Sequence, residues 1–135
     1  MTREILFRGK RVDNGEWVKG YLICPEFDKS RAYIGYLFPD DDHDLDVAEV
    51  ASSTVGRFTG LTDRNGVKIF EGDIVRYGDT IHRVVFEQRN GTAYFGLVYA
   101  ACETLPFGHY QDLKQIEVIG NIYDNPELLE VSGND

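Results

Sequence analysis

Residues 58–75 read FTGLTDRNGVKIFEGDIV, and this stretch indicates what kind of fold the chain adopts. It contains two turn signals, DRNG at 63–66 and Glu-Gly at 71–72, with short β-like runs between and after them. Asp63 can hydrogen-bond within its own turn, and Gly66 can take the left-handed conformation that the turn needs. Asp73, directly after the second turn, is placed to cap it. No nucleophile and base are paired here, so the stretch predicts a scaffold rather than a reaction centre.

The same pattern extends in both directions along the chain. Asn-Gly occurs at 14–15, 65–66 and 90–91, and both residue types tolerate the positive φ of a tight hairpin turn. After the first pair, alternation predicts two faces of one strand. One face carries Trp17, Lys19, Tyr21 and Ile23, and the other carries Val18, Gly20, Leu22 and Cys24.

Further strands are expected at 31–38 and as a run of short antiparallel strands from about 58 to 100. Strands this short, joined by tight turns, favour a small bent sheet or barrel. The segment QIEVIGNIY (115–123) is expected to close it, since barrels avoid exposed edges. Helix signals are few: one short helix is expected within 44–55, and Asn125-Pro126 opens a C-terminal turn of helix.

The size and composition of the chain are those of a globular protein. Its 135 residues are 42% hydrophobic and 27% charged, which suits one domain with a real core. No apolar run approaches the roughly 20 residues that cross a bilayer, and the first residues show no secretory signal. The sequence therefore predicts a cytoplasmic protein whose two cysteines, Cys24 and Cys102, are reduced thiols.

The charge is strongly negative and uneven. The net charge of −9 opposes binding to nucleic-acid phosphates and anionic membranes, so neither is expected as a partner. Between Glu26 and Glu49, eight acids face only Lys29 and Arg31, whereas residues 1–20 carry five basic residues against three acids. These oppositely charged segments could attract each other or a neighbouring subunit, although exposed pairs contribute about 1 kcal/mol or less.

Three kinds of residue are candidates for metal binding or catalysis: a run of aspartates, the histidines and one cysteine. Asp40, Asp42 and Asp44 have the D-x-D-x-D spacing of a calcium loop, but Leu45 and Ala51 stand where that loop needs Gly and Glu. A solvated acidic loop is the simpler interpretation. The remaining candidates lack zinc-ligand spacing or a nucleophile signature, so no metal, cofactor or catalytic residue is expected. They are His43, His82, His109 and Cys102.

Aromatic residues lie on the expected barrel strands. An exposed platform of them could stack bases or dock a peptide, whereas alternating aromatics more simply form the core. The residues are Tyr77, Tyr94, Phe95 and Tyr99. Together with Asp40, Asp42 and Asp44 they form the candidate interaction surface.

Three motifs, taken together, resemble the YopX family of phage and prophage proteins. They are REILFRGKR near the start, FTGLTDRNGVKIFEGDIVRY in the centre and EVIGNIYDNPELL near the end, spread over residues 3–129. The resemblance implies a β-rich fold with an SH3-type small barrel, a phage or prophage origin and a bacterial cytoplasmic location. It implies no catalytic residues. Residues 1–131 would form one such domain, with an N-terminal hairpin region at 1–50, a barrel at 55–125 and a frayed tail at 132–135.

The leading hypothesis from the sequence is a non-enzymatic interaction module that forms homo-oligomers and binds a phage or host protein. One alternative is an acidic mimic of nucleic acid that inhibits a host DNA-binding protein, suggested by the carboxylates between Asp40 and Glu49. Another is direct nucleic-acid binding through the small barrel, for which Arg76, Arg83 and Arg89 supply only a weak basic groove.

Overall fold

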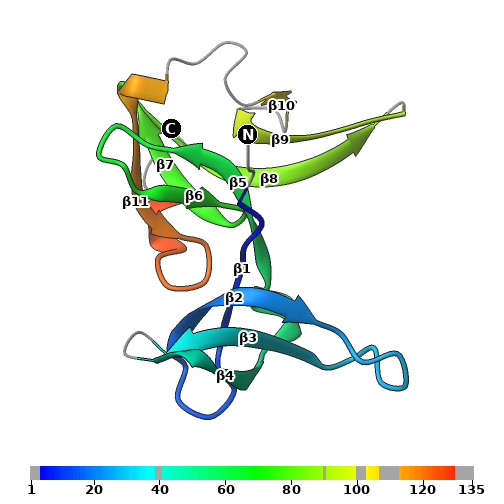
Figure 1. Cartoon of the computed structure of the whole chain (residues 1–135). Coiled ribbons are helices and arrows are strands. Elements are labelled where there is room, and N and C mark those ends of the chain that lie inside the picture. The colour runs from blue at the N-terminus through cyan, green and yellow to red at the C-terminus, as the bar shows by residue number, and fades with distance from the viewer. Residues whose placement is uncertain (1–3, 39–40, 90, 100–102, 107–112, 130–135) are drawn as a thin grey trace. The chain divides into compact units, whose positions relative to one another are not determined.

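The computed structural model of the chain describes residues 4–38, 41–89, 91–99, 103–106 and 113–129 (Figure 1). The fold is mainly β, as predicted, with antiparallel strands in two sheets. The six-stranded sheet has the order β4-β3-β2-β1-β5-β6, and the five-stranded sheet has the order β10-β9-β8-β7-β11. The strands are β1 (Phe7–Lys10), β2 (Trp17–Ile23), β3 (Ala32–Phe38), β4 (Asp41–Val50), β5 (Gly56–Thr62), β6 (Lys68–Phe70), β7 (Asp73–Tyr77), β8 (Thr80–Arg89), β9 (Thr92–Tyr99), β10 (Glu103–Pro106) and β11 (Ile116–Asn121).

The chain folds as two compact units, Met1–Phe58 (unit 1) and Thr59–Asp135 (unit 2). Each has its own buried cluster. In unit 1, Ala32, Ile34 and Val50 form it, and in unit 2 it consists of five fully buried aliphatic side chains. These are Ile69, Val75, Val84, Leu97 and Ile116.

In unit 1 the first Asn-Gly pair forms the expected hairpin between β1 and β2. Gly15 has a φ of +74°, and its N–H donates to the carbonyl of Arg11 at 3.0 Å. The predicted alternation along β2 is confirmed: Tyr21 and Ile23 are exposed, whereas Leu22 packs against the buried cluster.

The unit 1 sheet curls so that the end of β4 meets the chain just after β1. The N–H of Val12 donates to Glu49 at 3.1 Å, and the N–H of Ala51 donates to Lys10 at 2.8 Å. Arg11 and Val50 form an antiparallel bridge between these contacts. The last residues of β4 are therefore hydrogen-bonded on both sides, which protects this part of an edge strand.

The prediction of a short helix within 44–55 is wrong. Residues up to Val50 belong to β4, and only Ser52–Thr54 form a single 3₁₀ turn, η1. The β-branched Val47 and Val50 suit a strand, and pairing with β3 in the register Ala32–Val50 and Gly35–Val47 outweighs the weak helical pattern.

In unit 2 the Glu-Gly turn between β6 and β7 is built as its sequence predicts. Gly72 has a φ of +93°, and the Asp73 carboxylate accepts the N–H of Phe70 at 2.7 Å. Gly72 also links neighbouring segments, because its N–H donates to Val84 and its carbonyl accepts from Ile122, both at 2.9 Å. Strands β7, β8 and β9 then follow as consecutive antiparallel neighbours.

The segment expected to close the barrel forms 3₁₀ turn η3 (Leu113–Gln115) and then β11, which pairs with β7 at the edge of the five-stranded sheet. On its other side β11 meets the DRNG turn rather than a strand. The N–H of Arg64 donates to Ile116, and the N–H of Val118 donates to the Asp63 carboxylate, both at 2.9 Å. Among the described residues no closed barrel is formed.

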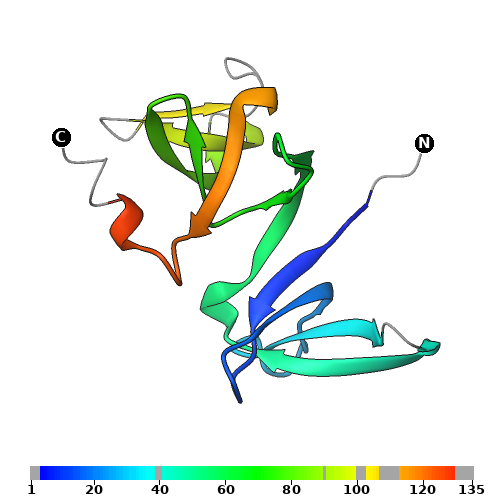
Figure 2. The ribbon, with the colours of Figure 1, turned by 90° about the vertical axis from the view of Figure 1, so that its left-hand side faces the viewer.

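Beyond β11 the chain makes the expected helical turn, at residues 127–129 (Figure 2). Asn125 accepts the N–H of Leu128 through its carbonyl, while its side chain accepts the N–H of Asn121. No helix in the described ranges is long and apolar enough to cross a membrane.

Candidate functional site

The structure separates the aromatic residues singled out in the sequence. Tyr77 and Tyr99 are partly buried and pack against the unit 2 cluster, so they belong to the core. Phe95 lies opposite Phe86 on the β8–β9 hairpin, with ring centroids 5.0 Å apart. Tyr94 is the next residue along β9, so its side chain points to the other face of the hairpin. The four side chains therefore do not form one platform.

The acidic and catalytic candidates fall largely outside the described part of the chain. Asp40, Cys102 and His109 are not described, and for Asp42, His43 and Asp44 the backbone lies in β4 but the side chains are not described. Cys24 is an exposed free thiol. No group of three or more metal-ligating side chains occurs among the residues that were described.

The side chain of His82 is buried and takes part in packing and hydrogen bonding. It is 5% exposed, and its two ring nitrogens lie 2.9 Å from the Val98 carbonyl and 2.7 Å from the Thr80 hydroxyl. Its ring also contacts Tyr99, with centroids 4.1 Å apart. These contacts hold the ends of β8 and β9 together.

Replacing His82 with alanine is therefore expected to lower the free energy of unfolding by about 2 kcal/mol, because packing and two hydrogen bonds are lost. Urea unfolding at neutral pH measures this, with the exposed neighbour Arg83→Ala as control. An equal effect of both substitutions would contradict the structural role of His82.

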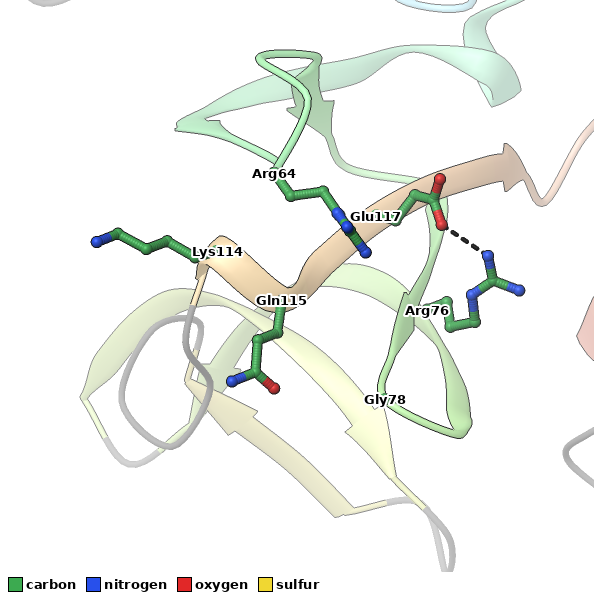
Figure 3. Close-up of a pocket in the computed structure, with 6 residues that line it drawn as sticks. All are labelled: Arg64, Arg76, Gly78, Lys114, Gln115 and Glu117. Carbon is green, nitrogen blue, oxygen red and sulfur yellow. Dashed lines mark hydrogen bonds and ion pairs between the residues drawn. The ribbon is translucent and has the colours of Figure 1, made fainter.

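The described cavities of unit 2 include an open hollow of about 300 Å³ beside β11. Figure 3 shows the side chains that line it. They are Arg64, Arg76, Lys114, Gln115 and Glu117, together with Gly78. We call this group the β11 hollow.

Four elements position the charged groups of the β11 hollow. Arg64 lies on the DRNG turn, Arg76 on β7, Lys114 in η3, and Glu117 on β11 directly opposite Arg76. Arg76 and Glu117 form an ion pair of 2.6 Å. The guanidinium of Arg64 reaches over β11 toward Glu117, whereas the ammonium of Lys114 points away from the other labelled groups (Figure 3).

The placement of Arg64 follows from the carboxylate next to it in the chain. Asp63 is 7% exposed and accepts the N–H groups of Asn65, Val67 and Val118 at 2.8–2.9 Å. Burial alone raises the pKa of Asp63, but these three hydrogen bonds outweigh it and hold the pKa below its ordinary value. The turn that carries Arg64 is thus fixed to β11 by a buried carboxylate.

A second hollow, of about 370 Å³, is lined by Arg64 and Lys114 together with residues 60–63 and Leu113. Two open hollows therefore share the same two cationic residues. The sequence does not predict this site, because its residues come from segments that are distant along the chain. The one local signal is the DRNG turn, which predicts a fixed backbone at Arg64.

Unit 1 carries an apolar surface of a different kind. Tyr21, Ile23 and Val47 are 60%, 43% and 47% exposed. The register places Tyr21 opposite Gly35 and Gly35 opposite Val47, and Ile23 opposite Tyr33, so these residues share one face of the sheet. We call the surface formed by Tyr21, Ile23, Tyr33 and Val47 the β2–β4 face.

Charged residues of opposite sign lie at the two ends of the β2–β4 face. At the basic end lies Lys19, on the same strand as Trp17. Arg8 and Lys10 of the neighbouring strand β1 place their charged groups over the Trp17 ring, 4.7 and 5.6 Å from its centroid. On the other side is Glu49, opposite Tyr33 and 3.9 Å from Arg31. Basic and acidic groups thus flank an exposed apolar centre.

These features define a small antiparallel β protein of two compact units. The chain belongs to the YopX protein family, whose sequence profile matches residues 6–130. This confirms the family resemblance drawn from the three motifs.

A solved structure shows a similar fold. The crystal structure of protein EF1440 from Enterococcus faecalis matches with a TM-score of 0.54 and 21% sequence identity, covering 95% of this chain and 99% of that chain. No curated protein matches the sequence.

Proposed function

We propose that this protein is a non-enzymatic interaction module that binds polypeptides, and that its first partner is a second copy of itself. The observation that carries the proposal is the β2–β4 face. Three of its side chains are between 43% and 60% exposed and lie on the same face of neighbouring strands. Exposed apolar side chains grouped in this way are typical of contact surfaces.

The charge pattern favours a second copy as the occupant. In a two-fold contact the same surface is used by both subunits, so the two ends of a patch come to lie opposite each other. Lys19 of one subunit then meets Glu49 of the other, with the apolar centre between them. The opposite charges thus support association and fix its orientation.

Sedimentation equilibrium of the unmodified protein, Tyr21→Glu and Phe27→Glu tests the contact. Phe27 is 93% exposed and outside the β2–β4 face, so placing the same charge there is the matched control. Placing a charge in the apolar centre should weaken self-association at least about tenfold, which corresponds to about 1.4 kcal/mol. Phe27→Glu should leave it unchanged. Identical mass profiles for all three proteins would contradict the proposal.

The non-enzymatic part of the proposal is supported by the use of His82 in packing rather than in an open site. It is tested by metabolite profiling of an extract incubated with the purified protein. Conversion of any compound that persists after a second purification, and is lost on boiling, would contradict it.

A second candidate function is the acidic mimic of nucleic acid, favoured by the −9 charge and the carboxylates of residues 40–46. Replacing Asp40, Asp42 and Asp44 with asparagine should then abolish salt-sensitive capture of host DNA-binding proteins. Unchanged capture would contradict this alternative and leave the polypeptide-binding proposal untouched.

A further inference from the structure

We propose that the β11 hollow binds a carboxylate group from an acidic segment of a partner polypeptide. This inference rests on the proposed function, because it names a chemistry of partner for a protein that works by binding. It involves residues of unit 2 only.

Cationic side chains gather at the β11 hollow. Residues 59–135 contain six lysines and arginines, and twelve acids, so this part of the chain is strongly acidic. Three of those six cations, Arg64, Arg76 and Lys114, line one hollow. Such a local excess of positive charge within an acidic molecule selects an anionic ligand.

The guanidinium of Arg64 is the group of the hollow that can donate hydrogen bonds to a ligand. Arg76 is already paired with Glu117. Among the described residues none forms a hydrogen bond or ion pair with the Arg64 guanidinium, although its backbone is fixed by the bond to Ile116 and by the neighbouring Asp63. A positioned guanidinium with its donors available binds carboxylates through two parallel hydrogen bonds.

The charge and polarity of the hollow favour a carboxylate over other anions. The Lys114 ammonium points away from the other labelled groups (Figure 3), so the charges that face one another in the hollow are those of Arg64, Arg76 and Glu117. Their sum of +1 matches one carboxylate better than a phosphate dianion. The exposed Gln115 amide adds both a donor and an acceptor, which suits the peptide group beside an acidic side chain.

The test is an amide and arginine side-chain NMR titration at low salt, using a blocked decapeptide of alternating glutamate and glycine. The same peptide with glutamine and the oligonucleotide dT10 are the comparison probes. We expect saturable shifts at Arg64, Gln115 and Glu117 with the glutamate peptide and none with the glutamine peptide. No shift with the glutamate peptide at 10 mM, or tighter binding of dT10, would overturn the proposal.

Three variants distinguish binding at the β11 hollow from attraction of the peptide by the overall charge of the protein. Arg64→Gln should weaken binding of the glutamate peptide at least about fivefold, because the available guanidinium is lost. Arg83→Gln makes the same charge change at an exposed position outside the hollow and should change affinity less than about twofold. Glu117→Gln removes the competing carboxylate and should strengthen binding about two- to threefold.

Equal weakening by Arg64→Gln and Arg83→Gln would overturn the inference, since only net charge would then matter. The NMR titration measures peptide binding to unit 2, whereas the sedimentation experiment measures self-association through the β2–β4 face. Failure of one is therefore distinguishable from failure of the other.

Discussion

Replacing Asp63 with alanine is expected to lower the free energy of unfolding by about 3 kcal/mol. Three backbone N–H groups, of Asn65, Val67 and Val118, lose a charged acceptor 2.8–2.9 Å away. A hydrogen bond to a charged group contributes about 1.5–3 kcal/mol, and the total stays below the sum because water reaches part of the turn. Urea unfolding at pH 7 measures the loss.

The exposed Asp79→Ala is the matched control for Asp63→Ala, since it removes a carboxylate from another turn of unit 2. It should change stability by less than about 0.5 kcal/mol. Equal effects of the two substitutions would show that the Asp63 contacts do not hold the DRNG turn to β11.

The Asp63 carboxylate also makes the free energy of unfolding depend on pH, and the direction of that dependence follows from its pKa. The pKa of Asp63 is lower in the folded protein than its ordinary value, so the folded state favours the ionised form. The resulting stabilisation is present above the ordinary pKa and is lost as the pH falls through the folded-state pKa. The stability deficit of Asp63→Asn should therefore be largest near neutral pH and shrink below about pH 4. A deficit independent of pH would contradict this.

Gly20→Ala is the second substitution with a large expected effect, a loss of about 3 kcal/mol or more from unit 1. A Cβ at Gly20 would lie 3.0 Å from the carbonyl carbon of Gly35 and closer still to its oxygen. Backbone atoms cannot yield as a flexible side chain can, so the strands must move apart. The fluorescence of Trp17, the single tryptophan, reports unfolding of this unit.

Gly15→Ala is the control for Gly20→Ala, because it introduces backbone strain without steric overlap. Gly15 has a φ of +74° with open space around its Cα, so alanine there should cost only about 1 kcal/mol. A Gly20→Ala effect no larger than that of Gly15→Ala would contradict the close approach of Gly20 and Gly35.

The predictions from the sequence succeeded where one short segment determines its own conformation. Asp63, Gly66 and Asp73 adopt their predicted turn roles because the side chain and the groups it contacts are neighbours in the chain. The faces of β2 followed equally from strict alternation. The family was identified from the same local motifs.

The predictions failed where the outcome depends on distant segments. Residues 44–50 fit a weak helical pattern, and only their pairing with β3 makes them a strand. The β11 hollow joins Arg64, Arg76 and Lys114, and no local pattern shows that the DRNG turn lies against β11. Among the described residues, the same contact places a turn, not a strand, at the second edge of β11, where the sequence predicted closure of a barrel.

The central claim, that the β2–β4 face binds a second copy, is tested most directly by intermolecular paramagnetic broadening. A nitroxide is attached to the exposed Cys24, which follows β2, in a chain with Cys102 replaced by serine. This chain is mixed with a nitrogen-15-labelled copy. The account predicts concentration-dependent broadening of the Tyr21, Ile23 and Val47 signals that is lost with Tyr21→Glu. Broadening confined to other residues, or none at any concentration, would contradict it.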